Sequence, residues 1–155
     1  MAKITMAQSS EGPTLFYSVS AAVGPGAPNR REDVLLVQYL LRESFKGPGF
    51  LAHPFPGPPL VVDGVASPNL FAAIVHFQRV ARLRGRTIAT DGRVDAPVGE
   101  QMRGSISQTQ YTIIFLNSAY DQARPQDYPR VSKAGDCPAE LRLPLREPSF
   151  IGRNA

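Results

Sequence analysis

Two aspartate–glycine pairs, Asp63-Gly64 and Asp91-Gly92, are the residues whose types and spacing most readily suggest chemistry. Two carboxylates could act as a general acid and base, or could bind calcium. Glycine, however, can adopt the positive φ that many turns need, and aspartate accepts hydrogen bonds from nearby backbone N–H groups. Because both pairs have the same local sequence context, we interpret them as turns that build the fold.

Two glutamines, Gln38 and Gln78, stand among apolar residues in segments with helical spacing. A side-chain amide both donates and accepts hydrogen bonds, so it can pair backbone groups of a neighbouring loop that would otherwise be unsatisfied. Ligand binding is the alternative role. We expect each glutamine to tie its helix to a loop.

Other reactive residue types are scarce. The chain has two histidines (His53 and His76) and one cysteine (Cys137), with no HExxH or GxSxG pattern. A glycosidase needs two carboxylates that flank a cleft, and nothing singles out a pair among the candidates Glu43, Asp95 and Glu100. The sequence therefore predicts no catalytic residues, no metal and no cofactor, and a protein that is not an enzyme.

The charge balance, 17 basic against 13 acidic residues with a net charge of +4, favours anionic partners. Basic residues gather at 79–86 (RVARLRGR), although a solvated helix end would show the same composition. The cluster lacks a nucleic-acid-binding motif, so we expect no nucleic-acid partner.

No apolar run reaches the ~20 residues that cross a bilayer, so we expect no membrane insertion. Residues 14–23 (TLFYSVSAAV) are as apolar as the core of a signal peptide, but their flanking residues do not fit one. We interpret them as a strand or an extended segment before the helical domain. Localisation stays open between the cytoplasm and export by a non-classical, phage or secretion-apparatus route.

The first helix is predicted over residues 30–44, with Asn29 as N-cap and Glu32 completing a capping-box pair. Residues 46–60 are too rich in proline for a helix and predict a long loop, followed by a short strand at 60–64. The residues expected to face inward from the first helix are Val34, Val37, Leu41 and Phe45, with Gln38 on the same side.

A second helix is predicted to open with Ser67 as N-cap and Pro68 at the first helical position, because both residues favour those positions. Short extended pieces flank Asp91-Gly92, and a third helical segment of one or two helices runs from near Pro97 to Tyr120. The inward-facing residues expected on the second helix are Leu70, Ile74, Phe77 and Ala81.

The fold class that follows is mainly α: a small three-helix bundle with short strands at the Asp-Gly turns. We expect an extended N-terminal segment (1–22), a helical domain (23–123) and an extended C-terminal tail (124–155) packed on the domain, with one strand at 140–145.

Three stretches in this order, VGPGAPNRREDVLLVQYLL, LVVDGVASPNLFAAIVHFQRVARL and ATDGRVDAP, resemble the bacterial peptidoglycan-binding domain of the three-helix, two-repeat type, over residues 23–104. The sequence departs from that family at Ser67 and Leu70, where the family has glycine and threonine, and in its longer 46–60 loop. The matching residues are Asp33, Val34, Gln38, Leu41, Val62, Asp63, Gly64, Pro68, Ala73, Ile74, Phe77, Gln78, Asp91, Gly92 and Val94.

The resemblance implies a non-catalytic module that binds peptidoglycan or its fragments. Candidate ligand-binding residues are Tyr39 and Arg42 on the outer face of the first helix, and Arg79 and Arg82 at the end of the second. The alternative is a cytoplasmic, phage-associated or secretion-associated module that keeps the fold and binds a protein partner instead.

Overall fold

The computed structural model describes residues 2–9, 12–97 and 111–146, and this part of the chain is mainly helical. A β-hairpin of β1 (Lys3–Ser9) and β2 (Gly12–Ser18) precedes the helices α1 (Arg31–Ser44), α2 (Pro68–Leu83), α3 (Thr112–Ala123) and α4 (Ala139–Arg142). Two short 3₁₀ helices, η1 (Pro48–Phe50) and η2 (Val131–Lys133), lie in the connections. Within the described ranges, no helix has the length and apolar character that crossing a bilayer requires.

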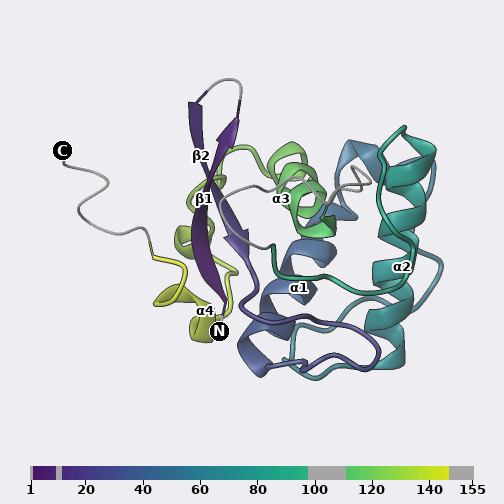
Figure 1. Ribbon diagram of the computed structural model, residues 1–155, viewed down its shortest axis with the longest axis horizontal. Helices are drawn as coiled ribbons and strands as arrows, with labels where there is room; N and C mark the ends of the chain where they lie inside the picture. Colours follow the sequence, from purple (N-terminus) through teal and green to yellow (C-terminus); the bar gives the residue numbers. More distant parts are fainter. Residues whose placement is uncertain (1, 10–11, 98–110, 147–155) are drawn as a thin grey trace.

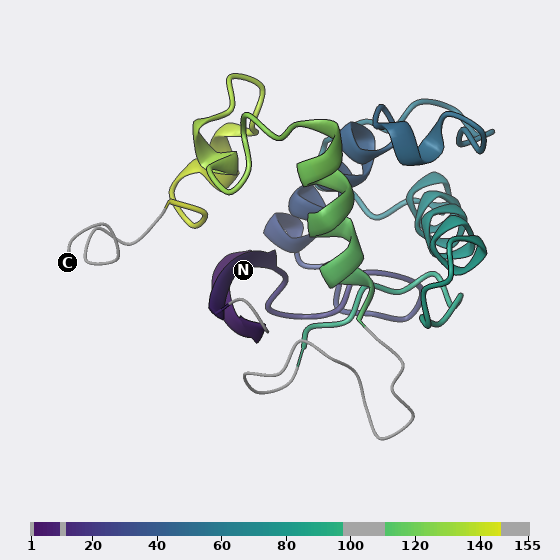
Figure 2. The same ribbon diagram turned by 90° about the horizontal axis from the view of Figure 1, so that it is seen from above.

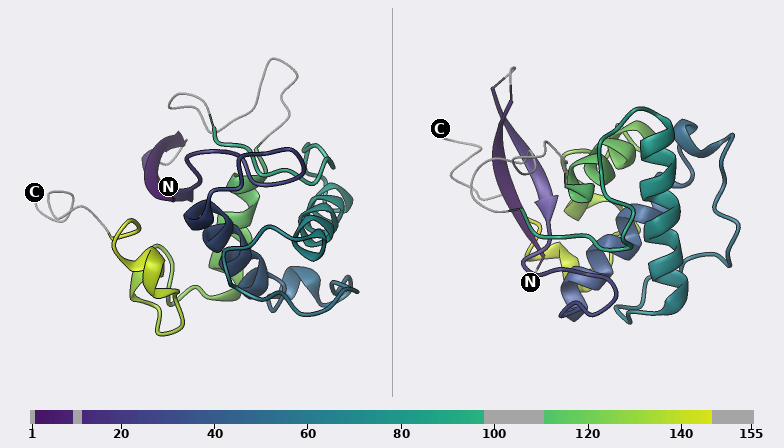
Figure 3. Two further views of the ribbon diagram at one scale, coloured as in Figure 1. Left: turned by 90° about the horizontal axis from the view of Figure 1, so that it is seen from below. Right: turned by 45° about the vertical axis from the view of Figure 1, so that its right-hand side comes forward.

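The helices α1 and α3 pack against each other at the centre of the molecule (Figure 1). Helix α2 lies on one side of this pair, whereas the hairpin and the C-terminal segment lie on the other side (Figure 2). The connection from α1 to α2 passes along α2 (Figure 3), and there Phe55 stacks on Phe45 with ring centroids 5.4 Å apart.

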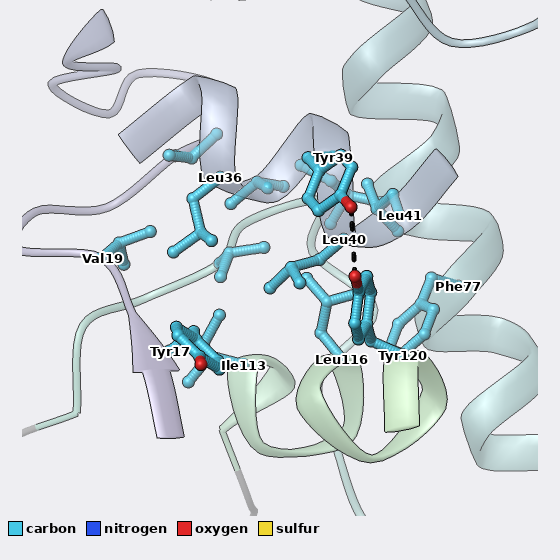
Figure 4. Packing of buried hydrophobic residues seen from close by; sticks show 14 of the residues in the cluster. Tyr17, Val19, Leu36, Tyr39, Leu40, Leu41, Phe77, Ile113, Leu116 and Tyr120 are labelled. Atoms are coloured by element: carbon cyan, nitrogen blue, oxygen red, sulfur yellow. Dashed lines mark hydrogen bonds between the residues drawn. The ribbon is translucent and has the colours of Figure 1, made fainter. Parts of the chain in front are cut away.

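Helix α1 is buried on nearly all sides, which differs from the expected helix with one inward stripe and an outer face. Eleven of its 14 residues are buried, including Leu36, Tyr39 and Leu40 outside the expected stripe. The reason is tertiary: α2 covers one side of α1, and α3 and α4 cover others. Figure 4 shows several of these side chains in the core.

The start of α1 corrects the predicted capping box. Asn29 precedes the N-cap residue Arg30, has a φ of +50°, and uses its side chain to close the preceding turn. Its Oδ1 accepts a hydrogen bond from Gly24 N, and its Nδ2 donates to the carbonyls of Gly24 and Ala27. Asparagine tolerates this left-handed conformation better than most residues, so it serves the turn instead of the helix.

Helix α2 begins as predicted. Ser67 Oγ accepts a hydrogen bond from Leu70 N at 3.1 Å, and Pro68 occupies the first helical position. The strand expected at 60–64 is wrong: these residues have no regular secondary structure. Around the second turn, pairing is limited to one bridge between Val23 and Val94. The third helical segment was predicted from near Pro97; residues 98–110 lie outside the described part, and α3 begins at Thr112.

The C-terminal segment, residues 124–146, is folded into turns, η2 and α4, so the expected extended tail with a strand at 140–145 is wrong for these residues. The rest of the expected tail, 147–155, lies outside the described part. A strand would place Leu141, Leu143 and Leu145 on one face. The structure buries Leu141 and Leu145 completely and leaves Leu143 71% exposed. That pattern follows the four-residue spacing of a helical turn.

A candidate ligand-binding pocket at the end of α2

Gln38 binds the first Asp-Gly turn from the middle of α1. Its Oε1 accepts hydrogen bonds from Asp63 N (3.0 Å) and Gly64 N (2.8 Å), and its Nε2 donates to Asp63 Oδ1 and to the carbonyl of Val65. Hydrogen bonds from Val65 N–H and the Gln38 amide lower the pKa of Asp63. Gly64 has a φ of +77°, and a Cβ there would lie 2.8 Å from the side chain of Arg31.

Gln78 binds the second turn in the same way from α2. Its Oε1 accepts from Gly92 N at 2.9 Å, and its Nε2 donates to the Arg93 carbonyl at 2.9 Å and to Asp91 Oδ1 at 3.2 Å. The same Nε2 lies 3.0 Å from Thr112 Oγ1 at the start of α3. Each aspartate also accepts a hydrogen bond from the backbone N–H two residues later. The side-chain amides of Gln38 and Gln78 therefore hold the two turns against α1 and α2.

Asp33 has a comparable position at the start of α1. It is buried, and its carboxylate accepts hydrogen bonds from Ser20 N (3.0 Å), Ser20 Oγ (3.1 Å) and Ala21 N (3.2 Å). The residues that carry the resemblance to the peptidoglycan-binding domain thus build turns and helix connections, and a ligand site has to be sought elsewhere.

Tyr39 was predicted to bind ligand from an outer face, and this prediction is wrong. The side chain is fully buried, and its hydroxyl donates to Asp136 Oδ1 at 2.7 Å and lies 3.1 Å from the Tyr120 hydroxyl (Figure 4). The C-terminal segment covers this side of α1, which the helical periodicity could not reveal. Burial raises the pKa of Tyr39, and it raises the pKa of Tyr120 to about 12.

Arg42 is half-buried and already paired. Its Nε donates to Glu43 Oε2 at 2.8 Å, and a second guanidinium nitrogen lies 3.6 Å from Asp136. Its charge is thus compensated within the fold, which leaves it less available to a ligand than the sequence suggested.

A partly buried ion network, which the sequence pattern did not predict, joins α1 to the C-terminal segment. Glu43 is 4% exposed, and its carboxylate lies within 3.1 Å of Arg124. Arg124 also donates to Asp136 at 2.7 Å and to the Tyr39 hydroxyl at 3.1 Å. Burial acts to raise the pKa of Asp136, but hydrogen bonds from Tyr39 and Arg124 outweigh it and lower that pKa. This network anchors the segment after α3.

The backbone geometry at the end of α2 directs Arg84 toward η1 and Arg86 toward α3. Gly85 has a φ of +89°, its N–H bonds the carbonyl of Arg82, and Arg86 N bonds the carbonyl of Ala81 at 3.0 Å. This pair of hydrogen bonds defines a Schellman motif, which ends a helix and reverses the chain. The guanidinium of Arg86 then lies over the Phe115 ring, 4.9 Å from its centroid.

A pocket of about 110 Å³ lies between this helix end, α3 and η1. Phe50 and Phe77, whose rings stack with centroids 5.6 Å apart, form part of its apolar wall. Arg84 and Arg86 supply its positive charge, and Ser118 and Gln122 of α3 are its polar side chains. The remaining lining residues are Val80, Ala81, Phe115 and Ala119.

The other two predicted ligand-binding residues, Arg79 and Arg82, are exposed on α2 but do not line this pocket. Their role in ligand binding stays a prediction. The pocket takes Arg84 and Arg86 from the same 79–86 cluster, because the chain reversal at Gly85 brings Arg86 back toward α3. The described ranges also contain no group of three histidine, cysteine, aspartate or glutamate side chains arranged to bind a metal.

Comparisons of the chain with protein-family models, with curated proteins and with solved structures return no match. The resemblance to the peptidoglycan-binding domain therefore rests on the residues and spacing of the chain itself.

Proposed function

We propose that the protein is a non-catalytic binding module for peptidoglycan or its fragments, and that the arginine-rich end of α2 forms the binding surface. The observation that carries this proposal is the exposure and the charge environment of four arginines, Arg79, Arg82, Arg84 and Arg86. All four are exposed, and none has an acidic side chain within ion-pair distance among the described residues.

Some arginines elsewhere in the structure pair with carboxylates, although others, such as Arg130 and Arg142, also have no acidic partner within ion-pair distance among the described residues. Arg31 pairs with Glu140 at 2.6 Å, Arg93 with Asp95 at 3.4 Å, and Arg124 with Asp136 at 2.7 Å. Guanidinium groups bind carboxylates in charge-assisted, often bidentate, hydrogen bonds, and the stem peptides of peptidoglycan carry free carboxylates. Four guanidinium groups at one helix end, without acidic partners among the described residues, therefore offer a surface for such a polymer.

The pocket chemistry favours binding over hydrolysis as the proposed activity. The side chains described around it are apolar groups, two guanidinium groups, one hydroxyl and one amide. Hydrolysis by acid–base catalysis would need a group that accepts a proton near neutral pH, and guanidinium, amide and hydroxyl groups do not do so.

Co-sedimentation with insoluble purified peptidoglycan tests this proposal. We expect the protein to pellet with the polymer, and the double variant Arg79→Glu/Arg82→Glu to pellet less, because it reverses two charges of the proposed surface. The matched control is Arg130→Glu/Lys133→Glu, which makes the same charge change at exposed positions of the C-terminal segment, on the other side of the molecule (Figure 2). Absence of pelleting above background in both low and moderate salt would overturn the proposal.

A protein-interaction or assembly module is the second candidate, and exposed apolar side chains favour it. Leu51 and Val61 in the connection between η1 and α2, and Leu83 at the end of α2, are large hydrophobic residues open to solvent. A partner that co-purifies with the native protein, and is lost when Leu51 and Val61 are both changed to serine, would support this candidate.

A further inference from the structure

The pocket between α2, α3 and η1 has the size for one small chemical group. Its volume of about 110 Å³ exceeds the ~30 Å³ that a water molecule occupies in the liquid, but it lies well below the roughly 300–1,000 Å³ of pockets that enclose drug-sized ligands. The walls formed by Phe50, Phe77, Val80 and Phe115 suit an apolar group, whereas the two arginines favour an anion. A ligand that fits both is a small aliphatic group that carries one negative charge.

The two guanidinium groups are held in place by neighbours that are not acidic. Arg86 lies over Phe115, and cation–π contact restricts where its head can move. Arg84 lies against Gly49: a Cβ built at residue 49 would be 2.2 Å from Arg84 Nη1. Glycine at this position therefore leaves the space that the Arg84 head occupies. The ring contact favours one position of the Arg86 head, which reduces the entropy that binding must overcome at that residue.

We infer that this pocket binds the terminal carboxylate of a peptide whose last residue has a small aliphatic side chain, such as alanine. The carboxylate receives hydrogen bonds from Arg84 and Arg86, and the methyl group contacts the aromatic wall. Ser118 and Gln122 also line the pocket, and their hydroxyl and amide groups can donate hydrogen bonds to and accept them from the last peptide group. The inference rests on the proposed function, since it names the part of peptidoglycan, the free end of a stem peptide, that the arginine surface would hold.

The test uses acetyl-D-alanyl-D-alanine as the probe and follows the backbone amide signals of the full chain by NMR. We expect saturable shifts at Arg86, Phe115 and Ser118, and affinity at least tenfold weaker for the same dipeptide with its carboxylate converted to an amide. Inorganic phosphate serves as a second probe. Equal affinity for the acid and the amide, or phosphate binding as tight as the dipeptide, would overturn the inference.

The variant Gly49→Ala separates pocket geometry from charge. It removes no charge, but its added methyl group displaces the Arg84 head, and we expect at least fivefold weaker binding of the dipeptide. Gly135→Ala is the matched control, because a Cβ at residue 135 meets nothing within 4 Å, and its affinity should equal that of the unchanged protein. Arg84→Ala should weaken binding as Gly49→Ala does. Circular dichroism spectra of all three variants establish that they are folded.

The failure of this inference is distinguishable from failure of the proposed function. If the protein pellets with peptidoglycan but does not bind the dipeptide, the proposed wall binding is supported and the assignment of the pocket is wrong. If the dipeptide binds in the expected way but peptidoglycan does not pellet the protein, the pocket is a peptide-carboxylate site and peptidoglycan is not its source.

Discussion

At the scale of single residues, two glutamine amides replace the backbone pairing that short strands would have supplied at the Asp-Gly turns. Gln38 and Gln78 each bind one turn through both ends of the amide. The apolar surroundings of the two residues indicated this kind of role in the sequence. The strand expected at 60–64 does not form, and the N–H groups of Asp63 and Gly64 bond to a side chain from a different element instead.

Replacing Gln78 with alanine should lower the free energy of unfolding by about 2–4 kcal/mol. The change leaves the Gly92 N–H and the Arg93 carbonyl without their partner, and each buried unsatisfied group costs about 1–3 kcal/mol. Urea unfolding followed by far-UV circular dichroism measures the loss. Gln122→Ala, at an exposed position, is the control and should change stability by less than about 0.5 kcal/mol. A loss below about 1 kcal/mol for Gln78→Ala would mean that water replaces the amide.

At the scale of elements, the contact between α1 and α3 decides which face of α1 can reach a ligand. Tyr39 on α1 and Tyr120 on α3 meet in the core with ring centroids 5.7 Å apart and hydroxyls 3.1 Å apart. Helical periodicity placed Tyr39 on the outer face, because it measures one helix alone. The position of α3 and of the segment after it converts that face into core.

Alkaline pH should destabilise this helix contact. Burial raises the pKa of Tyr120 to about 12, whereas a tyrosine in the unfolded chain ionises near ~10. The folded state therefore keeps its stability below about pH 10 and loses it as the pH rises toward 12. We expect unfolding by circular dichroism to accompany tyrosine ionisation at 295 nm, with the urea-unfolded protein, titrating near pH ~10, as reference. Ionisation of all tyrosines near pH 10 with an unchanged circular dichroism spectrum would contradict this expectation.

At the scale of the whole molecule, the segment after α3 is part of the core. Val131, Leu141 and Leu145 are completely buried, and the ion network around Arg124 joins this segment to α1. The hairpin is joined in a similar way, because Asn117 of α3 accepts a hydrogen bond from Tyr17 N and donates one to the Tyr17 carbonyl. The ends of the described chain thus contribute directly to the burial of α1 and α3.

The pair Leu141→Ala and Leu143→Ala tests this arrangement. Leu141 is completely buried, and its truncation should lower the free energy of unfolding by about 2–4 kcal/mol, as for other core leucines. Leu143, two residues away and 71% exposed, should change it by less than about 0.5 kcal/mol. Thermal and urea unfolding measure both. Equal, small effects of the two changes would show that the segment is not packed on the core.

The sequence by itself determined the features that depend on neighbouring residues. The start of α2 at Ser67-Pro68 follows from local hydrogen bonding and a fixed proline φ. The extents of α1 and α2 follow from apolar spacing, and the proline-rich connection between them follows from the missing N–H groups of proline. Each of these causes acts within a few residues.

Only the tertiary structure decided which residues remain free for binding. Tyr39 is buried in the core because segments about 80 and 100 residues later in the chain cover it, as its contacts with Tyr120 and Asp136 show. Arg84 and Arg86 become pocket residues because Gly85 reverses the chain and Phe115 and Gly49, from two other elements, position their guanidinium groups. The physical reason is the same in both cases: burial and charge pairing are set by contacts between distant parts of the chain, and local periodicity carries no information about them.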